Sequence, residues 1–157
     1  MLFASTLFIA AFIGNSMAQN SSKKFIMGPS AEKPGLESKA VKSFERSHPN
    51  INGEKWRSAD GNHIVTFKEH GIKNKIVYMQ NGQVDYALKI YDEDALPRQV
   101  RAAVKSIYYD YSITGVQELY LGKKIIHLIR LKGANTWKTI RVSNGDVDEI
   151  ESLAINQ

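Results

Sequence analysis

Apolar side chains recur along the chain with two different periods, and the periods alternate in a fixed order. From Leu36 to Phe44 they lie three or four residues apart, which predicts a helix over residues 37–48 that ends before Pro49. Shorter segments with a period of two follow, separated by turns that contain glycine, and the clearest alternation runs from Val84 to Ile90. The pattern predicts one helix followed by an antiparallel meander of three or four strands.

A second helix with one apolar face is predicted over residues 97–111. Pro97 suits a first helical turn, and the acidic run from Asp92 to Asp94 just before it suits the positive end of the helix dipole. Further alternating segments then follow up to the C-terminus. The predicted apolar stripe of this helix consists of Leu96, Val100, Val104, Ile107, Tyr108 and Tyr111.

The chain repeats short motifs at one spacing. Ala40–Ser43 recurs 63 residues later as Ala103–Ser106, and the Asn81-Gly82 pair recurs at the same spacing as Asn144-Gly145. Two matches in phase indicate a duplicated unit, with repeat one over residues 36–92 and repeat two over residues 93–157. A helix with one apolar stripe packs on one face of a sheet, so we expect an α+β fold in which both helices lie on the same face.

The first 35 residues differ from the rest. Residues 1–18 combine an apolar run with the small residues Ser16 and Ala18, which is typical of a signal peptide cleaved after Ala18, although an uncleaved anchor is the alternative. Residues 19–35 are polar and have no period, so we expect a flexible leader. The chain contains no cysteine, so a mature domain over residues 36–157 needs no disulfide.

The net charge of +5 comes from basic and acidic residues that are interspersed, without a dense basic block. This favours a solvated surface over nucleic-acid binding, and an exported chain meets few nucleic acids. After cleavage of the signal peptide we expect no stable membrane anchor.

No catalytic or metal-binding constellation is recognisable. The four histidines form no H-x-x-x-H or H-x-H motif, and a pair made by His63 and His127 still needs a third zinc ligand. The acidic run from Asp92 to Asp94 lacks the glycine and ligand spacing of a calcium loop, and the acidic residues from Asp146 to Glu151 are typical of a charged edge strand. We therefore expect no cofactor, no metal and no enzymatic activity, with a hydrolytic enzyme as the weaker alternative.

A candidate binding surface follows from aligning the two repeats at 63 residues. The alignment matches Val77 and Met79 with Ile140 and Val142, which predicts that these four residues face the helices. The residues that alternate with them belong to the uncovered face, where tryptophan, tyrosine and arginine are typical of protein-binding hot spots. The predicted patch consists of Ile76, Tyr78, Trp137, Thr139 and Arg141.

The order of elements also resembles a known family. Residues 40–56, "AVKSFERSHPNINGEKW", and residues 95–113, "ALPRQVRAAVKSIYYDYSI", each precede a set of strands and follow an export signal. In these features the chain is similar to the PepSY-like, β-lactamase-inhibitor-like exported proteins of the bacterial envelope. The resemblance covers roughly residues 38–151 and implies two helix-plus-meander repeats, with no catalytic signature.

These observations predict a periplasmic or secreted, non-enzymatic binding module that engages an envelope or extracellular protein or peptide through its open sheet face. Inhibition of a hydrolase is one form of that role. A protein that binds a small molecule or an envelope polymer is the alternative, and a deep apolar pocket would favour it.

Overall fold

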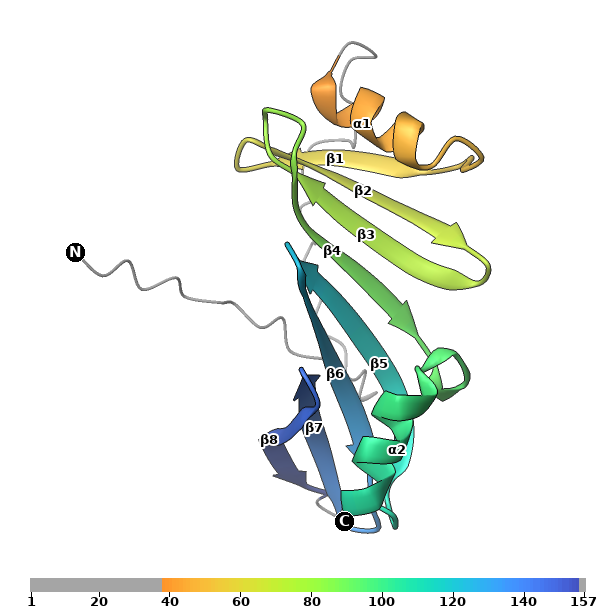
Figure 1. Ribbon diagram of the computed structural model, residues 1–157, viewed down its shortest axis with the longest axis vertical. Coiled ribbons are helices and arrows are strands. Elements are labelled where there is room, and N and C mark those ends of the chain that lie inside the picture. The colour runs from red at the N-terminus through yellow and green to blue at the C-terminus, as the bar shows by residue number, and fades with distance from the viewer. Residues whose placement is uncertain (1–37, 156–157) are drawn as a thin grey trace, which may run out of the picture.

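The computed structural model describes residues 38–155, which form an α+β fold built on one open, eight-stranded antiparallel sheet (Figure 1). Each strand pairs with the next along the chain, so the sheet order is β1 to β8 without a crossover. The elements in chain order are α1 (Lys39–Ser47), β1 (Lys55–Ala59), β2 (Asn62–Glu69), β3 (Ile72–Tyr78), β4 (Val84–Tyr91), the 3₁₀ turn η1 (Glu93–Ala95), α2 (Arg98–Ile107), β5 (Ser112–Leu121), β6 (Lys124–Lys132), β7 (Thr136–Ser143) and β8 (Asp146–Ala154).

Helix α1 begins at a side-chain cap and lies against the first half of the sheet. The Ser38 hydroxyl accepts a hydrogen bond from the Val41 N–H at 3.2 Å, which satisfies one of the free donors of the first turn. Phe44 is buried and makes edge-on ring contacts with Trp56 of β1 and Phe67 of β2. The helix and strands β1 to β3 therefore share one core cluster, which consists of Ala40, Val41, Phe44, Trp56, Val65, Phe67, Ile76 and Tyr78.

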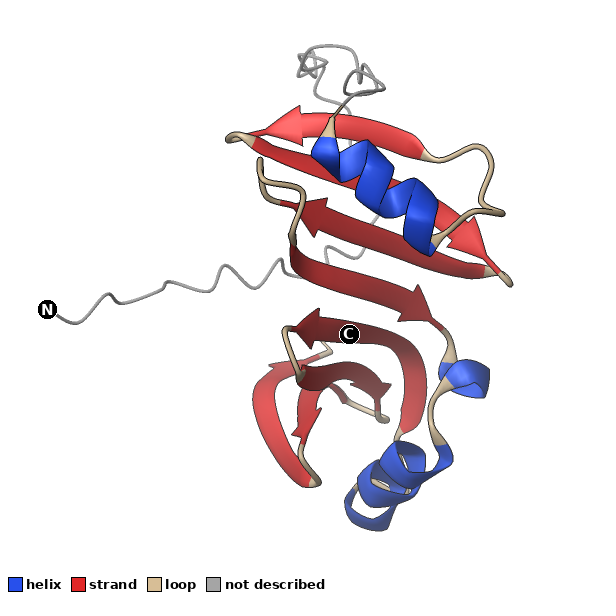
Figure 2. Cartoon of the chain, turned by 45° about the horizontal axis from the view of Figure 1, so that its top comes forward, coloured by secondary structure: helices blue, strands red, loops and turns tan. Residues whose placement is uncertain are grey.

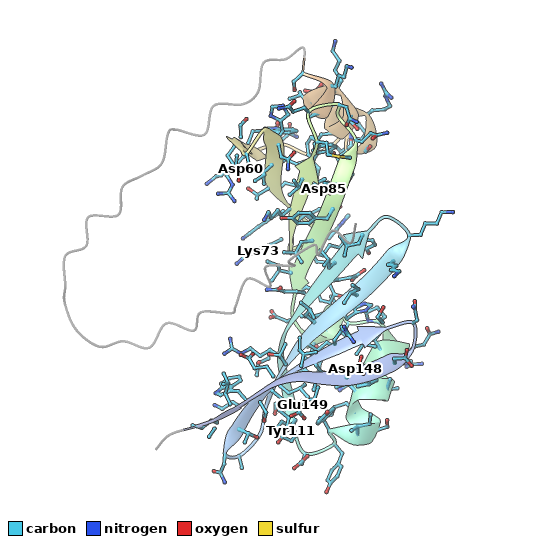
Figure 3. The ribbon with its side chains drawn as sticks, turned by 90° about the vertical axis from the view of Figure 1, so that its left-hand side faces the viewer. Asp60, Lys73, Asp85, Tyr111, Asp148 and Glu149 are labelled. Carbon is cyan, nitrogen blue, oxygen red and sulfur yellow. The ribbon has the colours of Figure 1, made fainter. Side chains whose placement is uncertain are left out.

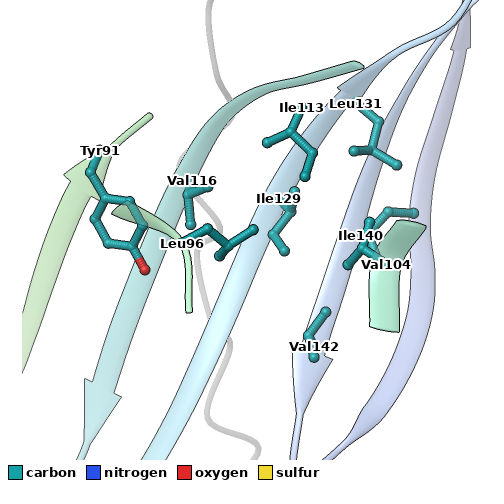
Figure 4. Packing of buried hydrophobic residues seen from close by; sticks show 9 residues of the cluster. All are labelled: Tyr91, Leu96, Val104, Ile113, Val116, Ile129, Leu131, Ile140 and Val142. Atoms are coloured by element: carbon teal, nitrogen blue, oxygen red, sulfur yellow. The ribbon is translucent and has the colours of Figure 1, made fainter. Parts of the chain in front are cut away.

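Helix α2 covers the second half of the sheet through a separate cluster (Figure 4). Val104 is fully buried, but the helix ends at Ile107, earlier than its apolar stripe predicts, and Ile107 is 55% exposed. Tyr108 and Tyr111 leave the helix and pack edge-on against each other beside the core. The cluster consists of Tyr91, Leu96, Val104, Ile113, Val116, Ile129, Leu131, Ile140 and Val142.

Both helices lie on the same face of the sheet (Figure 2). Strand β4 shows that the two clusters lie on the same side of the sheet. Ala87 packs on the α1 cluster, and Tyr91, which points to the same side four residues later, belongs to the α2 cluster. Across the β4–β5 pair, Ala87 lies opposite Tyr120 and Tyr91 lies opposite Val116. We call this side the helix face and the other side the open face, since no helix within residues 38–155 packs on it.

The predicted signal peptide (1–18), the whole of the predicted leader (19–35) and the first residue of the predicted helix (37–48) lie outside the described part of the chain. Within residues 38–155, neither helix is long and apolar enough to cross a membrane. The sequence analysis did not predict β1 as a distinct strand, because β1 has only five residues and only Trp56 among them is buried.

Candidate functional site

Three of the five predicted surface residues lie together on the open face of β7. We call Trp137, Thr139 and Arg141 the β7 patch. The Thr139 hydroxyl donates to a Glu151 carboxylate oxygen at 2.9 Å, and the Arg141 guanidinium pairs with Asp148 at 2.8 Å, both across the β7–β8 ladder. The strand thus presents an aromatic and a cationic side chain on one rigid, uncovered surface.

Trp137 is flanked by cations from the neighbouring strand. The Arg130 guanidinium carbon lies 4.8 Å from the centroid of the indole ring, and the Lys132 ammonium lies 5.5 Å from it. Lys132 is the direct cross-strand neighbour of Trp137. Cations over the face of an indole attract it electrostatically, which holds the half-buried ring in place.

The prediction for the other two residues, Ile76 and Tyr78, is wrong. Both belong to the core cluster beneath α1, and their exposed fractions are 8% and 1%. Val77, which the alignment assigned to the helix face, lies on the open face opposite Ile64 and Tyr86. Met79 follows β3 in the turn.

The error has its origin in the turns after β3 and β7. The turn after β7 has two residues, Asn144 and Gly145, whose φ angles of 55° and 92° are typical of a tight hairpin. The turn after β3 is longer, because Met79 accepts from Gly82 N–H at 2.8 Å and pairs with Gln83 beyond it. Aligning the Asn-Gly pairs therefore shifts the preceding strand by one residue, which exchanges the two faces of the sheet.

The central strands carry apolar side chains on the open face as well. Tyr86, Leu88 and Ile90, from the alternating segment that predicts β4, lie on this side. Their partners on β3 alternate with Ile76 of the α1 cluster, so they point away from the helices. Leu88 lies opposite Leu119, and Leu119 lies opposite Ile126. The open face therefore combines an apolar centre with the β7 patch beside it.

A polar cluster that the sequence analysis missed lies on the helix face between the two core clusters. The hydroxyls of Tyr91 and Tyr120 both donate to the carboxylate of Glu118, and the Nε2 atom of His127 lies 3.9 Å from the same carboxylate. We call these four residues the Glu118 cluster. One signal could have revealed it, because Glu118 stands in alternation with the buried Val116.

The surroundings shift the pKa values of the Glu118 cluster. Burial alone would raise the pKa of Glu118, but the hydrogen bonds from the hydroxyls of Tyr120 and Tyr91 outweigh it and hold the value below its usual range. Burial raises the pKa of Tyr91, and the hydrogen bond to Glu118 adds to that rise. Burial lowers the pKa of His127 despite the nearby carboxylate, so the neutral imidazole is favoured in the folded protein.

His127 is therefore expected to make the fold less stable in mild acid. Because its pKa is lower in the folded than in the unfolded chain, the unfolded state binds more protons as the pH falls below about 6.5. The free energy of unfolding, measured in urea at about pH 7.5 and about pH 5.5, should decrease in acid, and His127→Gln should reduce that decrease. His70→Asn, at an exposed turn, is the control. Equal pH dependence in wild type and His127→Gln would contradict this assignment.

Within residues 38–155, no group of three or more histidine, cysteine or acidic side chains is arranged to hold a metal ion. His63 lies on β2 and hydrogen-bonds Ser58, while His127 lies on β6, four strands away, so the two histidines do not meet. The acidic residues near the C-terminus lie on β8, an edge strand, as their pattern predicts. Glu93, from the acidic run before α2, pairs with Arg101 at 2.6 Å.

Several solved structures share the fold of this chain. No protein-family model and no curated protein matches the sequence. Among solved structures, a DUF2874 family protein from Bacteroides ovatus superposes with a TM-score of 0.62 at 19% identity, over 78% of this chain and 89% of that one. A BLIP-like protein from Bacteroides fragilis superposes with a TM-score of 0.61 at 13% identity, over 76% of this chain and 87% of that one.

A third structure, of a candidate periplasmic protein from Bacteroides eggerthii, has a TM-score of 0.59 at 14% identity and covers 74% of this chain and 87% of its own. At these identities the similarity concerns the fold. The chain therefore has a BLIP-like fold, and the Glu118 cluster and the β7 patch must be interpreted from their own geometry.

Proposed function

We propose that the protein is an exported, non-enzymatic binding module that engages a protein or peptide through the open face of its sheet. The observation that carries this proposal is the β7 patch, which holds a tryptophan and an arginine on a rigid strand that no described helix covers. Such residues dominate many protein interfaces because they bury a large area at little entropic cost. The half-buried leucines of the central strands extend the same surface.

Export is supported by the sequence of residues 1–18 and by the similarity in fold to a candidate periplasmic protein. We infer a periplasmic or secreted location and a relationship to the PepSY-like proteins. Inhibition of a hydrolase is one form of the binding role, and the similarity in fold to a BLIP-like protein supports it.

We also infer that the two halves of the sheet descend from one duplicated unit. In each half a helix precedes four strands, and both helices bury a valine of the same motif, Val41 and Val104. Helix-face residues of the third strands, Ile76 and Ile140, are 64 residues apart, and the shorter turn after β7 accounts for the difference from 63. A close superposition of residues 38–90 on residues 101–153 would support duplication, and unrelated strand paths would contradict it.

A pocket beside α2 supports the alternative of a small-molecule binder. A pocket of about 340 Å³ lies between α2 and the ends of β6 and β7, lined by Val100, His127 and Val142 among others. This volume is at the low end for ligand sites, and the pocket is open to solvent. The open face, where β7 presents Trp137 and Arg141, favours the protein partner.

Trp137→Ala is expected to weaken the binding of a partner by about 2 kcal/mol or more, the usual threshold for a hot spot. The measurement is affinity capture from the envelope fraction on the mature protein, followed by titration of the captured protein against each variant. Tyr109→Ala is the matched control, since Tyr109 is exposed and lies beside α2 rather than on the open face. Equal affinity of wild type and Trp137→Ala would remove the β7 patch from consideration.

A further inference from the structure

Four lysines converge on the open face of the first three strands. Lys55 and Lys75 lie on either side of Thr66 in the cross-strand register, and Lys68 lies directly opposite Lys73. We call Lys55, Lys68, Lys73 and Lys75 the lysine cluster. Figure 3 labels Lys73 on β3 and shows it on the side of the sheet away from α2.

Within residues 38–155, the acidic residues at registered open-face positions lie on β8, at the far edge of the sheet from the lysine cluster. The registered open-face positions of β1 to β6 contain neither aspartate nor glutamate, and no ion pair of Lys55, Lys68 or Lys73 with a carboxylate occurs within residues 38–155. The basic residues at these positions are Lys55, Arg57, Lys68, Lys73, Lys75, Lys124, Arg130 and Lys132.

This arrangement is unfavourable in the isolated protein. Like charges directly opposite each other on a sheet are destabilising, and Lys68 and Lys73 are such a pair. The Lys75 ammonium is held in place, because it donates to the Tyr86 hydroxyl at 3.1 Å and lies 5.4 Å from the centroid of that ring. Bound anionic groups would remove the repulsion.

The lysine cluster surrounds a shallow depression of about 490 Å³ next to apolar side chains. Ile90, which lies opposite Lys73 across the β3–β4 pair, forms one wall, and Leu88 lies opposite Lys75. A ligand seated there meets ammonium groups on one side and aliphatic side chains on the other. Lysines on one strand, two residues apart, repeat about every 6.6 Å, which is also the spacing of alternate side chains in an extended peptide.

We propose that the lysine cluster is the docking site for an acidic segment of the partner protein, in which carboxylate side chains stand next to apolar ones. The proposal rests on the proposed function, because it uses the same open face and specifies the chemistry of the partner. Charge complementarity requires an anionic partner, and the aliphatic wall favours a peptide over a polysaccharide or a row of lipid phosphates. The acidic segment would lie over β1 to β4, while the β7 patch contacts another part of the same partner.

The test measures binding of a short fluorescein-labelled peptide rich in glutamate and leucine to the mature protein by fluorescence anisotropy. The matched peptide has glutamine in place of every glutamate. We expect the acidic peptide to bind, the neutral one to bind at least about tenfold more weakly, and added salt to weaken the acidic one. The variant Lys68→Gln with Lys73→Gln should raise the Kd of the acidic peptide about tenfold.

A control variant, Arg98→Gln with Lys123→Gln, makes the same change in net charge away from the open face and should leave the Kd unchanged. Equal losses in the two double variants, or no binding of the acidic peptide to wild type, would overturn the proposal. Tighter, Lys68- and Lys73-dependent binding to phosphatidylglycerol vesicles than to the peptide would also overturn it in favour of a membrane surface. If Trp137-dependent capture persists while the peptide fails, the proposed function stands and only the acidic chemistry is wrong.

Discussion

Tyr78→Ala is expected to destabilise the protein by about 3–5 kcal/mol, the cost typical of removing a fully buried aromatic ring. Tyr78 is 1% exposed, and its ring stacks against Trp56 with centroids 6.1 Å apart. Removal of the ring leaves a cavity between α1 and the sheet, in a domain whose total stability is only about 5–15 kcal/mol. Urea unfolding at neutral pH, followed by circular dichroism, measures the loss.

The matched control is the same substitution at an exposed tyrosine. Tyr109 is 80% exposed, so Tyr109→Ala should change the free energy of unfolding by no more than about 0.5 kcal/mol. If Tyr78→Ala lowered the free energy of unfolding by less than about 1 kcal/mol, the result would contradict the buried position of Tyr78 beneath α1 and favour a position on the open face.

Alkaline pH gives an independent measure of the same burial. Burial raises the pKa of Tyr78 to about 12, whereas an unfolded tyrosine titrates near 10. A group with a raised folded pKa stabilises the fold below its unfolded pKa, so this contribution is lost as the pH rises from about 10 to 12. Tyr78→Phe keeps the ring and should remove this part of the alkaline loss.

The order of helices and strands could be predicted from the sequence because local patterns determine it. Apolar spacing in α1 and glycine turns before β2, β3, β4 and β8 lie within a few residues of the elements that they define. The end of α2 could not be predicted this way, since Ile107 continues the stripe in the sequence but projects into solvent. There the tertiary packing of Tyr108 and Tyr111 overrides the periodicity.

The two faces of the sheet were harder to assign than its strands. A face depends on whether the residue number is odd or even relative to a known buried position, so one additional residue in a turn reverses it. That occurred between β3 and β4, where the turn that contains Gly82 is longer than the one that contains Gly145. The prediction therefore assigned Trp137 and Arg141, on β7, to the face where the register has them, and it assigned Tyr78, on β3, to the wrong face.

The Glu118 cluster and the lysine cluster also depend on strand pairing that local sequence patterns do not determine. Glu118 and His127 are nine residues apart in the chain, and only the β5–β6 register brings them face to face. Lys68 and Lys73 likewise become neighbours through a hairpin. Pairs of this kind depend on register rather than on any motif, so the pairing could not be predicted from the sequence, although the alternation of Glu118 with Val116 indicated that this carboxylate faces the helices.

Glu118→Gln is expected to cost about 1.5–3 kcal/mol at neutral pH, the range for hydrogen bonds to a charged group. The substitution keeps the shape of the side chain but replaces a carboxylate that accepts from two tyrosine hydroxyls by a neutral amide. The NH₂ group of that amide is a donor, so it cannot accept a hydrogen bond from the tyrosine hydroxyl directed at it. Thermal or urea unfolding of the variant measures the cost.

The matched control is Glu149→Gln, which also removes a carboxylate that accepts two side-chain hydrogen bonds, in this case from a tyrosine hydroxyl and a lysine ammonium. The Glu149 carboxylate accepts from Lys138 Nζ at 2.7 Å and from Tyr108 at 3.3 Å, but it lies at the solvent-exposed edge of the sheet. Exposed pairs of this kind contribute at most about 1 kcal/mol. Comparable losses in the two variants would indicate that burial adds nothing to the Glu118 cluster.

The acid limb of the stability curve separates the charge of Glu118 from its shape. Because the pKa of Glu118 is lower in the folded protein than in the unfolded chain, the carboxylate stabilises the fold above about pH 4.5, and this contribution is lost as the pH falls through the folded value. Wild type should therefore lose stability below about pH 4.5 more steeply than Glu118→Gln does. The difference between the two proteins should shrink in acid, where the carboxyl group of wild type is protonated and can no longer accept from both hydroxyls as an anion. A difference that stays constant from neutral pH into acid would assign the cost of Glu118→Gln to packing rather than to charge.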